Sequence, residues 1–144
     1  MDMKIKLVRE NAALPKRATD GSAGYDLCAC ICEPVDILPG RTEKFPTGVA
    51  VQITPGYAGF VFARSGLGIK HGIVPANAVG VIDSDYRGEI MVGLHNQSEV
   101  AFTIQPGERI AQLVFLPVYT PELEESEDLE DTVRGAGGFG STGK

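Results

Sequence analysis

This sequence has no long apolar run and no excess of positive charge, and each absence excludes a class of function. No apolar run approaches the roughly 18 residues that a membrane-spanning helix requires, so we expect no membrane partner. Asp and Glu number 19 against 13 Lys and Arg, and the net charge of −6 argues against nucleic-acid binding, which requires a basic face. The opening MDMKIKLVRE carries charges within any candidate apolar core, so no signal peptide is visible. We therefore expect an intracellular, cytoplasmic protein, or a nuclear one if the source is eukaryotic.

Residues that commonly bind transition metals are also scarce. The only histidines, His71 and His95, stand alone, and the three cysteines lie together in CACIC at Cys28, Cys30 and Cys32. On a strand the three thiols would share one face, and thiolates are good zinc ligands. No fourth ligand follows at the usual spacing. We therefore interpret them as reduced core or half-buried cysteines in a reducing compartment, with a zinc site as the alternative.

Short apolar runs between glycine and proline turns predict an all-β protein. Turn signals PG recur at 39–40, 55–56 and 106–107, at about the spacing of a compact sandwich or barrel. The runs between turns are IKLV, TGVAVQI, GFVFA, EIMVGLHN, VAFTI and RIAQLVFLPV. In EIMVGLHN, alternate apolar residues indicate a half-buried strand, and only SGLGIKHG could form a helix, of one or two turns. The length of 144 residues fits one domain that buries roughly two-thirds of its unfolded surface.

The pattern changes after Pro117. PELEESEDLEDT contains seven carboxylates and almost nothing apolar, which predicts a self-repelling, extended linker. The chain then ends in RGAGGFGSTGK, and such a glycine-rich segment is normally disordered because glycine loses the most backbone entropy on ordering. Successive glycines can instead turn several N–H groups toward one anion, and the ring of Phe139 could stack on a base. Both interpretations of this tail remain open from the residues alone.

Three internal segments could carry chemistry. In ARSGLG a strand runs into Arg64, Ser65 and the short helix, so the serine either caps the helix or joins the arginine in holding phosphate. In PGERIAQLVF, Gln112 is a polar residue inside an apolar run, and it is either a structural bridge or a ligand contact. GVIDSDYRGEI indicates a β-hairpin that presents Asp83, Asp85 and Tyr86 at its tip.

For that predicted hairpin, the ordinary interpretation is an aspartate that bonds its own turn and a tyrosine that packs at the rim. The alternative interpretation is that the aspartate acts as a general base, as a metal ligand or as both. Two segments are candidates for phosphate binding, ARSGLG and the glycine-rich tail, and the tail also carries the ring of Phe139. Together with Asp83 and Tyr86, these features indicate a nucleoside polyphosphate ligand. They name neither the base nor the reaction.

Five motifs, in order along nearly the whole chain, make the sequence similar to the trimeric dUTPase family. They are AGYDL (23–27), RSGLG (64–68), GVIDSDYRG (80–88), PGERIAQLVF (106–115) and RGAGGFGSTG (134–143). The resemblance implies a jelly-roll-like β-barrel that forms a homotrimer, with sites at the subunit boundaries and tails exchanged between subunits. It implies a division into a barrel domain (1–120), an acidic linker (121–133) and a glycine-rich lid (134–144). Small departures from the commonest family pattern, at Gly68 and Ser84, touch no matched catalytic position.

The activity implied by the resemblance is Mg²⁺-dependent hydrolysis of dUTP to dUMP and pyrophosphate, which keeps uracil out of DNA and supplies dUMP for thymidylate synthesis. Asp83 matches the residue that activates the attacking water, and Asp26 matches one that touches the magnesium ion through water. Met91 matches a position that packs against the nucleoside, with simple core packing as its alternative role. The substrate-binding residues implied by the resemblance are Arg64, Ser65, Gly66, Asn77, Val81, Ile82, Asp83, Tyr86, Met91, Gln112, Arg134, Gly138, Phe139, Gly140, Ser141 and Thr142.

Two rival functions are weighed beside this one. The first is the dCTP deaminase branch of the same fold, and IDSDYRG together with GGFGSTG favours uracil hydrolysis over it. The second is a non-catalytic trimeric jelly-roll protein with a regulatory or scaffold role. The presence of Asp83, Tyr86, Arg64 and Phe139 argues against a decayed site.

Overall fold

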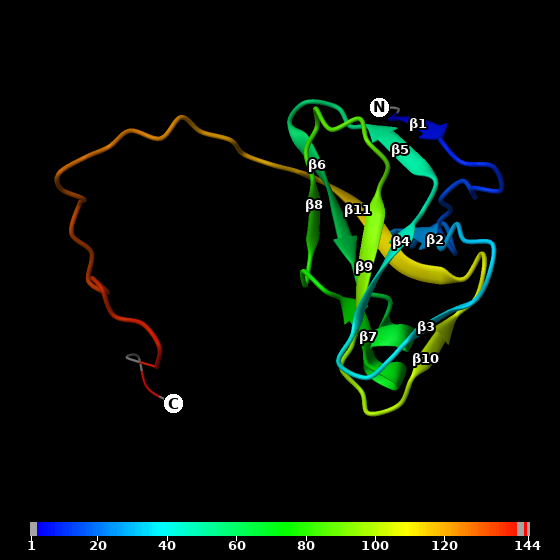
Figure 1. Ribbon diagram of the computed structural model, residues 1–144. Helices are drawn as coiled ribbons and strands as arrows, with labels where there is room; N and C mark the ends of the chain where they lie inside the picture. The colour runs from blue at the N-terminus through cyan, green and yellow to red at the C-terminus, as the bar shows by residue number, and fades with distance from the viewer. Residues whose placement is uncertain (1–2, 141–142, 144) are drawn as a thin grey trace.

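The structure is a computed structural model that describes residues 3–140 and residue 143. Across these residues the chain forms short strands and one short helix, η1 (Gly66–Lys70) (Figure 1). The strands are β1 (Lys4–Leu7), β2 (Tyr25–Cys28), β3 (Val35–Ile37), β4 (Thr42–Pro46), β5 (Val49–Gln52), β6 (Tyr57–Phe62), β7 (Ile73–Pro75), β8 (Gly80–Ile82), β9 (Met91–Asn96), β10 (Phe102–Ile104) and β11 (Arg109–Pro117).

The strands pair into small antiparallel sheets that wrap around one core. A four-stranded sheet has the order β2-β11-β6-β8, a three-stranded sheet has the order β4-β9-β7, and β1-β5 and β3-β10 form two-stranded ribbons. The predicted all-β, jelly-roll-like fold is confirmed, although the sheets do not close into one continuous barrel. Most strands have three to six residues, and β4, β7 and β11 each end in a proline, which has no N–H to donate to a further strand.

The core is built by alternation along these strands. In β9 and the residue before it, Ile90, Val92 and Leu94 are buried whereas Met91 is 37% exposed, so the predicted one-sided pattern is confirmed. The helix η1, also predicted, follows β6 and buries Leu67. The largest fully buried apolar side chains come from many of the strands and the loops between them: Phe45, Leu27, Ile37, Ile53, Ile73, Leu94, Ile104, Ile110, Leu113 and Val49.

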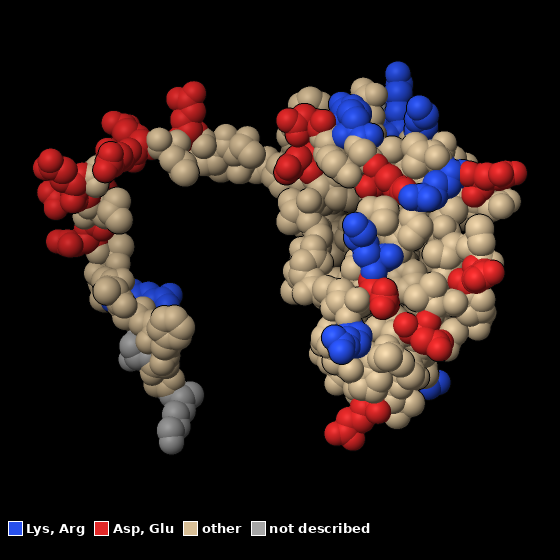
Figure 2. Space-filling model, in the orientation of Figure 1, with Lys and Arg blue, Asp and Glu red and all other residues tan. Residues whose placement is uncertain are grey.

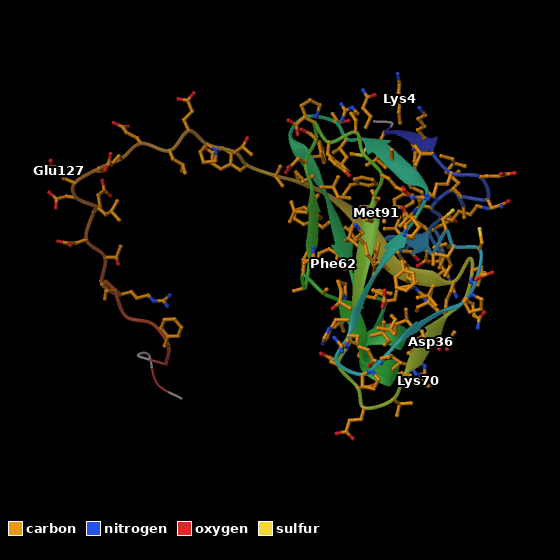
Figure 3. All side chains as sticks on the ribbon, viewed as in Figure 1. Lys4, Asp36, Phe62, Lys70, Met91 and Glu127 are labelled. Atoms are coloured by element: carbon orange, nitrogen blue, oxygen red, sulfur yellow. The ribbon has the colours of Figure 1, made fainter. Side chains whose placement is uncertain are left out.

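Beyond β11 the chain leaves this body. The amide of Val118 still donates to the carbonyl of Gly56 at 2.9 Å, and the residues after it run outward as an extended arm (Figure 1). Acidic side chains line the arm in Figure 2, and Figure 3 shows Glu127 far from Met91 in β9. Leu123, Leu129 and Phe139 are each at least 88% exposed on it. In the described part of the chain, no helix has the length and apolar character to cross a membrane.

Candidate functional site

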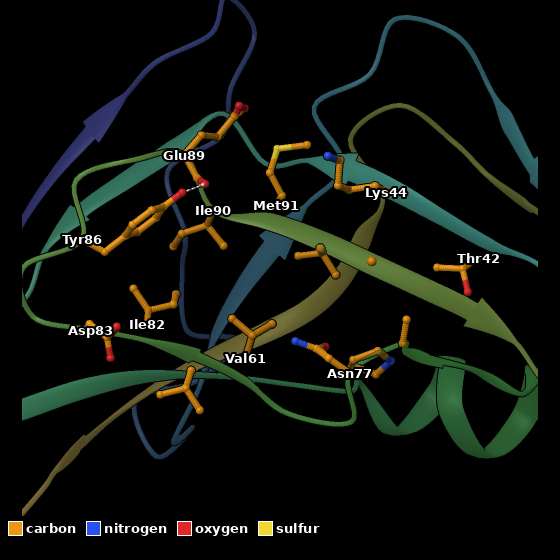
Figure 4. Close-up of a pocket in the computed structure, with 16 residues that line it drawn as sticks. Thr42, Lys44, Val61, Asn77, Ile82, Asp83, Tyr86, Glu89, Ile90 and Met91 are labelled. Atoms are coloured by element: carbon orange, nitrogen blue, oxygen red, sulfur yellow. Dashed lines mark hydrogen bonds between the residues drawn. The ribbon is translucent and has the colours of Figure 1, made fainter.

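The first candidate site is a cavity of about 490 Å³ between β8 and β9, called here the β8–β9 pocket (Figure 4). Strands of two different sheets form its walls, and the loops that follow β7 and β8 close its ends. It brings together one group of the predicted site residues: Asn77, Val81, Ile82, Asp83, Tyr86 and Met91. These residues come from three segments of the sequence, namely ANAVG, GVIDSDYRG and EIMVGLHN, and the fold brings them together in one cavity.

The segment GVIDSDYRGEI is not the hairpin that the sequence predicts. β8 pairs with β6, through Gly59 opposite Ile82, whereas β9 pairs with β4 and β7. The segment therefore crosses from one sheet to the other. Its apolar ends suggested two strands correctly, but the choice of partner depends on distant parts of the chain. Because β8 and β9 do not pair, the space between them is free to form the pocket.

The crossing segment presents Asp83 and Tyr86 in a tight loop. Asp83 follows β8 directly and is exposed, and its carbonyl accepts a hydrogen bond from the Tyr86 amide at 3.2 Å. The Tyr86 hydroxyl donates to the carbonyl of Glu89 at 2.9 Å, which folds the ring back across Gly88 (Figure 4). A Cβ atom at Gly88 would lie 2.5 Å from Tyr86 Cζ and closer still to Oη. Only glycine allows the ring this position.

A strained turn places Asn77 at the other end of the pocket (Figure 4). The amide of Ala78 donates to the carbonyl of Pro75 at 3.1 Å, and Ala78 has a φ of 63°. This left-handed conformation costs a residue with a side chain about 1 kcal/mol. Strain of this kind often accompanies functional loops, because it persists only where the surroundings hold it in place. On β9, Met91 faces the pocket and is partly exposed, so simple core packing does not describe it.

The second candidate site is a smaller cavity of about 260 Å³ beside β2 and β11, called here the Arg64 pocket. Arg64 Nε donates to one carboxylate oxygen of Asp26 at 3.2 Å, and Arg109 donates to the other at 3.4 Å. Ser65 also lines this pocket and, although it precedes η1, its side chain makes no capping hydrogen bond. The capping interpretation of Ser65 is therefore wrong.

Gln112 lies in the same pocket and is the structural bridge that the sequence suggested, while its contact with a ligand stays a prediction. Its Nε2 donates to the carbonyl of Ala63 at 2.9 Å, which makes it a structural bridge between β11 and the end of β6. An amide nitrogen carries two N–H donors, so the second is available to a ligand. A Cβ atom at Gly24 would lie 2.5 Å from Gln112 Oε1, so the glycine of AGYDL makes room for this amide.

The cysteines do not form the shared strand face that would suit a metal. Cys28 ends β2, whereas Cys30 and Cys32 lie beyond it, and all three are free thiols. Burial raises the pKa of the Cys28 thiol, and the nearby Asp26 carboxylate raises it further. Across residues 3–140 and residue 143, no three His, Cys, Asp or Glu side chains are grouped to hold a metal ion. The zinc alternative thus gains no support.

The tail contributes to neither pocket in this chain. Arg134 Nε donates to the carbonyl of Gly137 at 2.7 Å, which makes a small local turn, and Phe139 is fully exposed. Gly138, which is half-buried, and Gly140, which is exposed, continue this arm, and the predicted site residues Ser141 and Thr142 lie outside the described residues. The remaining lining of the β8–β9 pocket includes Lys44, its one cationic residue. The two pockets have no lining residue in common.

Some residues of the site were missed by sequence reasoning. Lys44 and Glu89 line the β8–β9 pocket, and Arg109 faces Asp26, yet none was predicted. The sequence did contain a pattern that could have indicated Arg109, since it is a charged residue at the start of the apolar run RIAQLVF. No local pattern indicated Lys44 or Glu89. Lys44 reaches the pocket because β4 pairs with β9, and Glu89 reaches it because the segment before β9 crosses between the two sheets.

The fold and the two pockets define an all-β protein with an apolar-walled cavity and a separate, arginine-bearing pocket suited to an anion. Comparison with known proteins makes the class specific. The dUTPase family model matches residues 10–143. The chain therefore belongs to the dUTPase family of enzymes.

Individual relatives support this assignment. Deoxyuridine 5'-triphosphate nucleotidohydrolase of Paraburkholderia xenovorans is 52% identical over 145 residues, which cover 100% of this chain and 98% of that protein. The corresponding protein of Hahella chejuensis is 57% identical over 90% of this chain and 86% of its own. A variant dUTPase of Staphylococcus bacteriophage 80alpha, solved with dUpNHpp, has a TM-score of 0.90 at 32% identity, over 99% of both chains.

Proposed function

We propose that this protein hydrolyses dUTP to dUMP and pyrophosphate at sites that are shared between the subunits of a homotrimer. The observation that carries the proposal is the division of the predicted substrate residues between two pockets of one chain. The β8–β9 pocket has the groups to bind a nucleoside but Lys44 as its one lining cation, while the Arg64 pocket has the groups to bind phosphate. A complete site therefore joins the first pocket of one copy to the second pocket of another.

In the β8–β9 pocket, Asn77 and the backbone groups of Val81 and Ile82 read the edge of uracil. The Tyr86 ring lies beneath the deoxyribose, where a 2′-hydroxyl would meet the ring without a hydrogen-bond partner. Rejection by steric conflict is a common basis of specificity. Met91 packs against the nucleoside from the β9 side of the pocket.

Asp83 positions the attacking water and accepts its proton. An ionised carboxylate offers only acceptors, so it orients a water by binding one O–H and leaves the oxygen lone pair aimed at phosphorus. The water attacks the α-phosphorus in line, the bond to the bridging oxygen breaks, and pyrophosphate leaves. Because Asp83 is exposed at the end of β8, a water and a phosphate can both reach it.

In the Arg64 pocket, the guanidinium of Arg64 and the hydroxyl of Ser65 hold the phosphates, and Gln112 bonds an oxygen near the α-phosphate. Gly66 follows Ser65 as the first residue of η1, outside the lining of this pocket, and contributes its backbone to the same phosphates. Asp26 orients Arg64 through its Nε, and Nη1 also donates to the carbonyl of Arg109 at 3.5 Å, which leaves Nη2 and the second N–H of Nη1 for the ligand. An arginine fork matches a phosphate with two parallel hydrogen bonds.

The residues beside Arg64 also fit a magnesium ion that binds mainly to the substrate. Asp26 is a single carboxylate, 19% exposed, and its two arginine contacts leave lone pairs for a water of the ion. Mg²⁺ keeps several waters and prefers substrate phosphates to an all-protein cage. When bound, the ion would neutralise charge on the three phosphates. The structure of a variant dUTPase from phage phi11 of Staphylococcus aureus reveals the coordination of a structural Mg(II) ion. That chain has a TM-score of 0.82 to this one at 29% identity, over 91% of this chain and all of that one.

The arm after β11 supplies the lid, with residues 1–120 as the barrel domain, 121–133 as the linker and 134–144 as the lid. A fully extended segment from 118 to 133 can span about 50 Å, enough to reach a neighbouring subunit. In the closed lid, Phe139 covers the uracil. The groups that wrap the β- and γ-phosphates are Arg134, Gly138, Gly140, Ser141 and Thr142. Closure excludes water and so strengthens the electrostatic contacts.

The test is pyrophosphate release from the eight common nucleoside triphosphates and from dUTP, with Mg²⁺ present. The proposal predicts rapid release from dUTP alone. Ammonia release from dCTP would instead assign the deaminase branch, and no turnover of any nucleotide would favour a scaffold role. The expected role of the reaction is to keep uracil out of DNA and to supply dUMP for thymidylate synthesis.

A further inference from the structure

An ion pair outside the residues assigned above joins the N-terminal segment to the loop that carries Tyr86. Arg9 Nε donates to both carboxylate oxygens of Glu89, at 2.8 Å to Oε2. The two residues are 80 positions apart in the sequence. The Glu89 side chain is 16% exposed and that of Arg9 is 49% exposed, so the pair lies at the rim of the β8–β9 pocket that Glu89 lines.

The same glutamate carries the acceptor that holds Tyr86. The Tyr86 hydroxyl donates to the carbonyl of Glu89 at 2.9 Å. The next residue is fixed by the core, because the amide of Ile90 donates to the carbonyl of Val49 at 2.8 Å and its carbonyl accepts from Thr47 Oγ1 at 2.7 Å. The peptide that carries the acceptor carbonyl thus lies between an ion pair on one side and a buried anchor on the other.

Arg9 can act as an anchor because its own backbone is held. The amide of Val8 donates to the carbonyl of Gly48 at 2.8 Å, and the carbonyl of Arg9 accepts from the amide of Ala12 at 3.3 Å. The pair therefore ties the loop of Tyr86 to a fixed part of the body.

The pair also changes the charge of the pocket. Two carboxylates, Asp83 and Glu89, line it, and a nucleoside triphosphate carries several negative charges. Arg9 neutralises Glu89, whereas no salt bridge engages Asp83 within the described residues. An unpaired Glu89 would repel the ligand and would be free to turn into the pocket.

We infer that Arg9 and Glu89 are positioning residues that hold the Tyr86 ring, and that through this ring they set the preference for a deoxyribose over a ribose nucleotide. The inference rests on the proposed function, since the preference is defined for dUTP against UTP. Neither residue touches the substrate through its side-chain charge. Each acts through the loop between Asp83 and Ile90.

The first test is the selectivity of Arg9→Ala and Glu89→Gln, measured as the ratio of kcat/KM for dUTP to that for UTP. A part-exposed ion pair contributes enough to change this ratio by about two- to fivefold. Arg41→Ala is the matched control, since Arg41 is an exposed arginine outside both pockets. The inference predicts a lower ratio in both variants and the parent ratio in Arg41→Ala. An unchanged ratio in Arg9→Ala, or an equal fall in Arg41→Ala, would overturn it.

The second test separates the pair from a loss of folding. The exchange Arg9→Glu with Glu89→Arg should recover the ratio, because it restores the attraction. A folded exchange variant that stays at the level of Arg9→Ala would contradict the inference.

The third test does not need activity. Ring signals of ¹³C-labelled tyrosine, with Tyr86 assigned by Tyr86→Phe, should shift in Arg9→Ala and not in Arg41→Ala. If the protein fails to hydrolyse dUTP, the proposed function is wrong, and the ring signals still decide whether the pair positions Tyr86. An unshifted Tyr86 signal in Arg9→Ala would refute that positioning.

Discussion

The most informative single substitution is Gly88→Ala, because the structure says which atoms must move. A Cβ atom at Gly88 would lie 2.5 Å from Tyr86 Cζ and 2.9 Å from Cε2. Ordinary contacts between such atoms are about 3.5 Å, so the ring must shift by about 1 Å. The shift breaks the 2.9 Å hydrogen bond from the Tyr86 hydroxyl to the carbonyl of Glu89.

Two magnitudes follow from this displacement. The lost hydrogen bond lowers the free energy of unfolding by about 1 kcal/mol, a small effect on the fold. A misplacement of about 1 Å in a group that orients the substrate can reduce the rate by up to about 100-fold. We therefore expect kcat/KM for dUTP to fall by about ten- to 100-fold, with a smaller fall for UTP, so that the selectivity ratio decreases.

The assay is steady-state pyrophosphate release with dUTP and UTP, together with thermal unfolding. Gly21→Ala is the matched control, because a Cβ atom at Gly21 would meet nothing within 4 Å and its φ is not in the left-handed region. If Gly88→Ala keeps the parent selectivity, or changes it no more than Gly21→Ala does, the position assigned to Tyr86 is wrong.

The remaining predictions concern the base, the lid and the thiols. Asp83→Asn should bind dUTP with similar affinity in calorimetry and lose at least about 100-fold in kcat, since the amide cannot accept the proton; full turnover would remove the base assignment. A chain that ends before Arg134 should keep its melting temperature, because in the described chain Val118 makes the one hydrogen bond from the arm to the body, but should lose most of its kcat/KM; normal hydrolysis would contradict the lid. Because burial raises the pKa of Cys28 and Cys32 is exposed, a thiol reagent near pH 8 should label Cys32 first and Cys28 last, with the site read by mass spectrometry.

Local patterns predicted the strands whose alternation is visible in the sequence. In EIMVGLHN the aliphatic residues Ile90, Val92 and Leu94 recur at every second position, and the burial pattern of β9 follows this period. By contrast β4 has the sequence TEKFP, with three exposed polar residues and a final proline, and only its pairing with β9 makes it a strand. Short strands of this kind depend on partners far along the chain, which a local pattern does not contain.

The difference between local patterns and contacts of distant segments also explains which site residues could be predicted from the sequence. Asp83, Tyr86 and Gln112 could be proposed as site residues from the sequence because each is a polar or aromatic residue at a turn or inside an apolar run. The hairpin assigned to the first two was wrong because β8 takes β6 as its partner and leaves β9 to the other sheet. The contact of Arg9 with Glu89 could not be predicted at all, since no local pattern relates residues 80 positions apart.

The most direct test of a site shared between subunits is complementation between two inactive variants. Asp83→Asn damages the β8–β9 pocket and Arg64→Ala damages the Arg64 pocket, so each homotrimer alone should be nearly inactive. When the two chains are co-refolded in equal amounts, about a quarter of the sites combine an intact pocket from each variant, because subunits assort at random. The account predicts recovery of about a quarter of the parent activity in the mixture, whereas a mixture that stays as inactive as its components would contradict it.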